Sequence, residues 1–165
     1  MQRSINRIVL LAALLFLAAS LFAKDAPKYK TAEVKQVTLA DGVQLPDNIN
    51  PPQFLKLMSD EIREQLTKKD FAEQVIADGA AVPDADVANS IVVECKITDF
   101  KKAGHTMMHP AEITVTINVY HRSDHSPIAN GSPNVKLLPA MYRSDEHLAH
   151  ALGGWVAGET HKILK

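Results

Sequence analysis

The chain has 165 residues, of which 18 are basic and 19 acidic, and its formal net charge at pH 7 is −1. This balance argues against a nucleic-acid-binding protein, because phosphate binding needs a basic surface. Its one cysteine, Cys95, excludes an internal disulfide.

Residues 1–23 have the pattern of a secretory signal peptide. Arg3 and Arg7 precede an uncharged apolar run, and Ala23 is a small residue suited to the position before a cleavage site. The run has roughly 15 residues, fewer than the ~20 of a membrane-spanning helix. We therefore expect a periplasmic or secreted protein of the bacterial cell envelope, which associates with the membrane only if the signal is uncleaved. An uncleaved N-terminal anchor is the alternative.

Cleavage after Ala23 would remove two basic residues, so the formal charge would change from −1 to −3. Residues 24–30 are polar, and we expect them to form a flexible leader. The remaining residues, 31–165, are long enough to form a single domain with its own core.

The first predicted elements of this domain are a strand over 31–39 and a helix. Asn50 is a suitable N-cap for the helix, Pro51 suits its first position, and Gln53 follows three residues after the cap. The helix is expected to end near residue 69. Apolar residues at three- and four-residue spacing predict one buried face, made of Phe54, Leu55, Met58, Ile62 and Leu66.

Four further strands are predicted over residues 71–76, 90–100, 111–121 and 128–138. The strand 111–121 alternates strictly between apolar and polar residues, which is typical of a strand with one buried and one solvated face. On strand 90–100, Cys95 shares a face with apolar residues, so we expect its side chain to be buried and to pack as a small hydrophobic group. Gly131 and Pro133 predict a bulge or an edge position in the last strand.

The last predicted element is a helix over 144–164, capped by Ser144. On a helical wheel its apolar residues form one arc, and three histidines lie on the opposite, polar side. These histidines are His147, His150 and His161. Three glycines weaken the helix, so close packing against the sheet or a partner is expected to compensate. They are Gly153, Gly154 and Gly158.

The element order is therefore β-α-β-β-β-β-α. It predicts an α+β fold, a two-layer sandwich in which two helices cover one face of a mostly antiparallel sheet of about five strands.

The segment 86–131 resembles an uncharacterised family of bacterial cell-envelope proteins, many of them lipoproteins known only as a domain of unknown function. The resemblance rests on residues 88–100, which read ANSIVVECKITDF, on the strand 111–120, and on the turn leading to 128–131. The order of the two helices is also similar. The resemblance implies an α/β envelope domain, accessory to a transport or assembly system, and carries over no functional residue. The chain departs from the family by lacking the lipobox cysteine.

All seven histidines lie in the last 61 residues, and four of them form two pairs with H-x-x-x-H spacing. His105 and His109 enclose Met107 and Met108, and imidazole with thioether ligands suits copper. The second pair, His121 and His125, encloses a carboxylate and is more typical of zinc.

These two pairs cannot form one site in a monomer. They flank the strand 111–121, whose length places them on the order of 35 Å apart. A pair alone is an incomplete coordination sphere, so solvated loop histidines are the alternative to a metal site. We expect no cofactor, with copper or zinc at residues 105–109 as the exception.

No nucleophile elbow, glycine-rich phosphate loop or H-E-x-x-H motif occurs in the sequence. We therefore predict a non-catalytic envelope domain that binds an unidentified envelope protein; a periplasmic copper- or zinc-binding protein is the alternative. The expected contact surfaces are the glycine-bearing side of the last helix and the solvated face of the sheet. That face comprises Glu94, Lys96, Thr114, Thr116, Asn118 and Tyr120.

Overall fold

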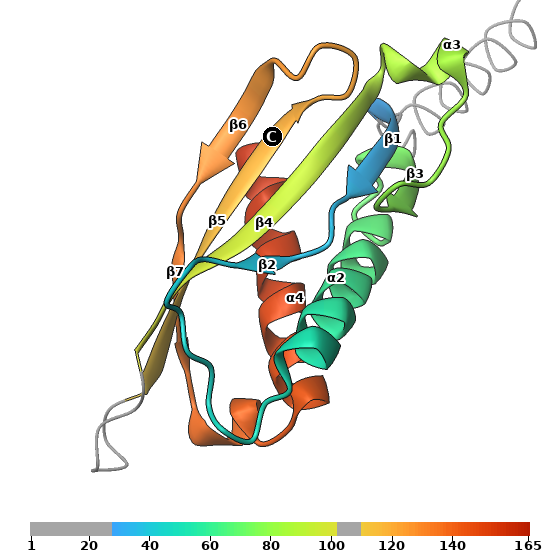
Figure 1. Ribbon diagram of the computed structural model, residues 1–165. Coiled ribbons are helices and arrows are strands. Elements are labelled where there is room, and N and C mark those ends of the chain that lie inside the picture. Colours follow the sequence, from blue (N-terminus) through green and yellow to red (C-terminus); the bar gives the residue numbers. More distant parts are fainter. Residues whose placement is uncertain (1–27, 102–109) are drawn as a thin grey trace, which may run out of the picture.

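The computed structural model describes residues 28–101 and 110–165 and shows two layers, a sheet and a pair of long helices (Figure 1). The strands are β1 (Tyr29–Val34), β2 (Thr38–Leu39), β3 (Ala72–Ala77), β4 (Ser90–Lys101), β5 (Ala111–His121), β6 (Pro127–Gly131) and β7 (Asn134–Leu137). The helices are α2 (Pro51–Thr67), α3 (Asp84–Val87), the 3₁₀ turn η1 (Pro139–Tyr142) and α4 (Asp145–Ile163). This arrangement confirms the predicted α+β sandwich.

The sheet is mixed, with the strand order β3-β1-β4-β5-β6. In addition, β2 pairs with β4, and β7 pairs with β5. The predicted antiparallel strands are present in the C-terminal half, where β4, β5 and β6 pair in sequence. The sheet is nevertheless mixed, because β1 lies parallel to both β3 and β4 and β2 lies parallel to β4. The connection from β1 through α2 to β3 explains the parallel pairing of β1 with β3, since a helical crossover between adjacent strands makes them parallel.

The start of α2 is confirmed in detail. The side chain of Asn50 accepts a hydrogen bond from the backbone N–H of Gln53, at 3.5 Å, and Pro51 is the first helical residue. Four of the five predicted inward residues are buried, whereas Leu55 is only partly buried. The cap and the apolar spacing thus determine where this helix begins and which face it buries.

The predicted first strand is divided into two. β1 begins at Tyr29, inside the expected leader, and the chain leaves the sheet after Val34. Between β1 and β2, Val37 is buried and its backbone N–H donates to the hydroxyl of Ser59 on α2, at 2.9 Å. This contact with the helix replaces a sheet pairing, which is why the strand is interrupted. Residues 24–27 of the leader and the signal peptide lie outside the described residues.

The core fills the space between the sheet and the two helices. The inward side chains of β4 and β5 are buried, including Cys95, and so are Leu148, Leu152 and Val156 of α4. The last predicted strand is interrupted as expected: β6 ends at Gly131 and β7 resumes at Asn134, and both pair with β5. Among the described residues, no helix combines the length and the apolar character needed to span a bilayer.

Gly153 is the point where α4 meets α2. A Cβ atom added there would lie 2.7 Å from Cβ of Glu61 and 3.2 Å from the carbonyl oxygen of Met58. The expected close packing is therefore present at this glycine, although its neighbour is α2 and not the sheet. At Gly154 and Gly158 an added Cβ would meet no described atom within 4 Å.

The three glycines should respond differently to alanine. We expect Gly154→Ala and Gly158→Ala each to raise the free energy of unfolding by up to about 1 kcal/mol, because alanine is the better helix former and the space is open. Gly153→Ala should lower it, because the added methyl group collides with α2. Urea unfolding of the three variants measures these changes; equal effects at all three positions would contradict the close approach.

Candidate functional site

The face of the sheet away from α2 and α4 is the predicted solvated face, here called the outer face. In Figure 1 α4 lies behind β4 and β5, so this face is turned toward the viewer. The register pairs Glu94 with Asn118 and Lys96 with Thr116, so these side chains stand side by side. Glu94 and Lys96 are exposed, and the four polar residues of β5 are half-buried. The alternation of apolar and polar residues along the strand 111–121 therefore predicts correctly which side chains face the core and which face outward.

A buried carboxylate lies at the β1 side of the outer face. The side chain of Glu33 is 3% exposed and forms ion pairs with Arg122 and with Lys35, whose Nζ lies 3.1 Å away. The backbone N–H of Gly79 donates to the same carboxylate at 2.9 Å. A buried charge is tolerated only with such partners, so Glu33 joins β1 to the turns after β3 and β5. The sequence offers no signal for the pair with Arg122, 89 positions away.

A second ion pair extends this network toward solvent. Nζ of Lys35 donates to the carboxylate of Asp78 at 2.8 Å, and the backbone N–H of Gln36 donates to its other oxygen at 3.2 Å. The hydrogen bond to Asp78 raises the pKa of Lys35, and the bonds from Lys35 and Gln36 lower the pKa of Asp78. The network fixes the ends of the parallel strands β1 and β3 next to each other.

A shallow pocket of about 390 Å³ lies beside this network, between the ends of β1 and β3 and helix α2. Its charged side chains on α2 are paired with one another: Asp60 lies 2.7 Å from Nη2 of Arg63 and 3.6 Å from Nζ of Lys56. The hydroxyl of Ser59 donates to the carbonyl of Leu55 at 2.7 Å and accepts from Val37. These contacts are structural, and they leave this hydroxyl bound to backbone groups rather than to a base.

The turn between β5 and β6 holds the histidine pair that suits zinc. The ring of His125 stacks on Tyr120, with centroids 5.3 Å apart. The carboxylate of Asp124 accepts from the backbone N–H and the hydroxyl of Ser126, and these bonds lower its pKa. Within residues 28–101 and 110–165, no three His, Cys, Asp or Glu side chains are placed to hold a metal ion. The contacts of Asp124 and His125 are made with the neighbouring Ser126 and Tyr120.

The other predicted metal ligands lie outside the described residues. They are His105, Met107, Met108 and His109. Copper or zinc binding by this segment therefore stays a prediction from the sequence.

The three histidines of α4 do not share one environment. His147 and His150 are exposed, as expected for a polar face, and Nδ1 of His150 lies 3.1 Å from a carboxylate oxygen of Glu61. The ring of His161 lies against Phe71, with centroids 6.4 Å apart, and its Nδ1 is buried without a hydrogen-bond partner. His161 is therefore only partly exposed, because Phe71, in the short segment before β3, lies against its ring.

Cys95 is buried on the inner face of β4, as the alternation predicts. Burial, with a smaller contribution from Glu94, raises the pKa of its thiol to about 12. Since the thiolate is the reactive form, this environment is that of a structural cysteine.

Comparison with known proteins gives the fold but no family. No protein-family model matches the chain, and no curated protein matches it. The chain is similar in structure to the hypothetical protein CT253 from Chlamydia trachomatis, with a TM-score of 0.57, 12% identity, and coverage of 82% of this chain and 98% of that chain.

Two further bacterial structures have the same fold. Protein XCC0632 from Xanthomonas campestris, assigned to DUF330, gives a TM-score of 0.51 at 13% identity, over 84% of this chain and 91% of that chain. The PelC dodecamer from Paraburkholderia phytofirmans gives a TM-score of 0.50 at 11% identity, over 81% of this chain and 88% of that chain. At these identities the likeness shows the fold alone. It agrees with the predicted resemblance to bacterial proteins of unknown function.

Removing the buried carboxylate should destabilise the domain. We expect Glu33→Ala to lower the free energy of unfolding by about 3 kcal/mol. This value is at the low end of the range for a broken buried ion pair, because the Arg122 side chain is 25% exposed. Glu64→Ala is the matched control, because it breaks an exposed pair with Lys68 and should have a much smaller effect. Urea unfolding measures both; equal losses would contradict a structural role for Glu33.

His161 should make stability depend on pH. Burial first, and then Lys165 and Lys69, lower its pKa in the folded protein. The unfolded chain therefore binds a proton more readily, and stability should fall as the pH drops through about 6.5, the ordinary histidine value. His161→Gln should reduce this fall, and His147→Gln should not. Unfolding curves between about pH 7.5 and pH 5.5 provide the test; identical pH profiles for wild type and His161→Gln would contradict it.

Proposed function

We propose that the chain is an exported, non-catalytic domain of the bacterial envelope that acts through protein contacts, as an accessory to a transport or assembly system. Export is supported by Arg3, Arg7 and the apolar run that follows them. The fold supports a bacterial domain of this kind, because it is shared with bacterial proteins of similar size.

The observation that carries the proposal is the uncovered outer face. The long helices cover the other face of the sheet, and Figure 1 shows the strands β4, β5 and β6 without a long helix in front of them. Their outward side chains are mostly polar and include the charged Glu94 and Lys96, whereas Val92 is buried and the half-buried ring of Tyr120 stacks on His125. Tyrosine is enriched at protein interfaces, and a regular polar surface around it supplies hydrogen-bonding groups.

The partner that fits this face is a second copy of the chain. Glu94 and Lys96 are exposed neighbours on one strand and carry opposite charges. In a two-fold interface each residue of one copy can meet its opposite charge on the other, so the surface is complementary to itself. The PelC protein with this fold forms a dodecamer. For this chain we propose self-association, and we do not assign it twelve subunits.

The test is the native and denatured mass of the protein purified from cell fractions. We expect an oligomer at micromolar concentration, and a denatured mass that lacks residues 1–23. Thr116→Arg places a bulky charge in the outer face and should shift the oligomer to monomer. Gln53→Arg adds the same side chain at an exposed position of α2 and should not.

Three results would contradict the proposal. A wild-type monomer at this concentration would exclude self-association, and an unchanged oligomer in Thr116→Arg would exclude the outer face. A native mass raised by bound copper or zinc, and lowered again in a His105→Ala/His109→Ala variant, would favour the metal-binding alternative.

A further inference from the structure

Four consecutive apolar residues, 138–141, are exposed where the chain passes from β7 to α4. Leu138 is 59% exposed and Met141 is 38% exposed, and they are the large hydrophobic side chains found exposed in the described part of the chain. Pro139 and Ala140 between them are exposed as well. A run of this kind costs solubility and is uncommon on a protein surface unless it contacts something. We call residues 138–141 the apolar tip.

The apolar tip is held in a fixed conformation. The backbone N–H of Met141 donates to the carbonyl of Leu138 at 2.8 Å, which closes the turn η1. The side chain of Asn48 donates to the carbonyl of Arg143 at 3.2 Å and fastens the end of the turn to the loop before α2. Leu137, the preceding residue, fills the core and is buried. The two exposed side chains are therefore presented to solvent by a supported turn.

The position of the apolar tip suits a flat apolar environment. η1 lies at one end of the molecule, far from the β5–β6 turn and from the C-terminal end of α4 (Figure 1). A single convex turn offers much less than the roughly 800 Å² per partner that a stable protein interface buries. Entry of two side chains into the boundary of a lipid bilayer needs no such area.

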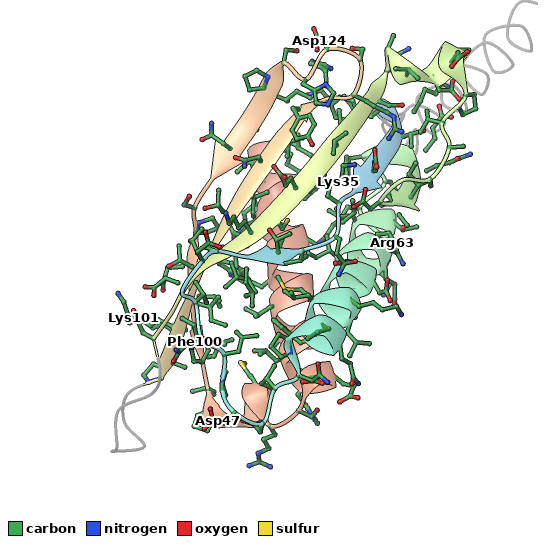
Figure 2. All side chains as sticks on the ribbon, viewed as in Figure 1. Lys35, Asp47, Arg63, Phe100, Lys101 and Asp124 are labelled. Atoms are coloured by element: carbon green, nitrogen blue, oxygen red, sulfur yellow. The ribbon has the colours of Figure 1, made fainter. Side chains whose placement is uncertain are left out.

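Basic residues bracket the apolar tip in the sequence. Lys136 precedes it and Arg143 follows it, and both are exposed. Acidic groups also lie at this end: Glu112 is 3.9 Å from Nζ of Lys136, Figure 2 places Asp47 beside the turn, and Glu146 is exposed in the first turn of α4. Each of the two cations is separated from the apolar tip by one residue of the sequence, Lys136 by Leu137 and Arg143 by Tyr142. Cations in this position hold anionic headgroups while the apolar side chains enter the acyl region.

We propose that the apolar tip is a membrane-contacting site, in which Leu138 and Met141 enter the surface of a bilayer that carries anionic headgroups at Lys136 and Arg143. This site is separate from the outer face, so it goes beyond the proposed function and does not depend on it.

The test attaches an environment-sensitive fluorophore to the full chain at Ala140→Cys. Cys95 is buried and its thiol has a raised pKa, so the new thiol reacts selectively. Vesicles of phosphatidylethanolamine with about a quarter phosphatidylglycerol supply the anionic surface. We expect the emission to shift to the blue when vesicles are added, and high salt to weaken the shift. The fluorophore reports on its own position, and a shift caused only by membrane binding of residues 1–23 would not depend on Leu138 and Met141.

The control fluorophore is placed at Ser123→Cys, an exposed position in the β5–β6 turn at the other end of the molecule. It should show no shift. In the Ala140→Cys background, Leu138→Ser/Met141→Ser should raise the lipid concentration at half-maximal shift about tenfold or more. Leu138→Met/Met141→Leu keeps the apolar character and should preserve the shift.

Four outcomes would overturn the proposal. They are no shift at Ala140→Cys, equal shifts at both labelled positions, a shift that the serine variant leaves unchanged, and a shift without vesicles that grows with protein concentration. The last outcome would assign the apolar tip to contact between copies of the chain.

Discussion

The antiparallel pairing of β4 with β5 is the constraint on which the rest of the structure depends. It sets the register along both strands, with one shift at a bulge between Ile97 and Asp99, and on either side of the bulge the side chains alternate between the two faces. A slip of one residue would move Cys95 and its apolar neighbours to the solvated side and bring Glu94 and Lys96 into the core. The helices can cover the inner face, and the outer face can stay polar, only in the observed register.

The sequence predicts those features that depend on neighbouring residues. The alternation in 111–121, the cap at Asn50 and the interruption at Gly131 are local, and the structure confirms all three. The central position of β1 is not local, because its partners β3 and β4 are later segments and their order depends on the crossover through α2. The Glu33–Arg122 pair and the environment of His161 depend in the same way on distant parts of the chain, so periodicity could not reveal them.

The candidate surfaces follow the same division. The outer face was predictable because a half-buried strand shows its solvated side in the sequence. The apolar tip was not, because the predicted strand 128–138 includes both Leu137 and Leu138, and only the three-dimensional structure separates the buried Leu137 from the exposed Leu138. The outer face and the apolar tip use different side chains, so one copy of the domain can engage both at once.

The position of β1 also constrains the order of folding. It is synthesised before the other strands, yet both of its neighbours in the sheet come later in the chain, and its pairing with β4 requires residues 90–93. The β4–β5–β6 hairpins join segments close in sequence, so their loops close at the lower entropic cost. The C-terminal meander is therefore the natural nucleus, and β1 is added to its edge together with β3. Because α4 is made last and covers the inner face, a chain interrupted before residue 145 would leave that apolar face open to aggregation.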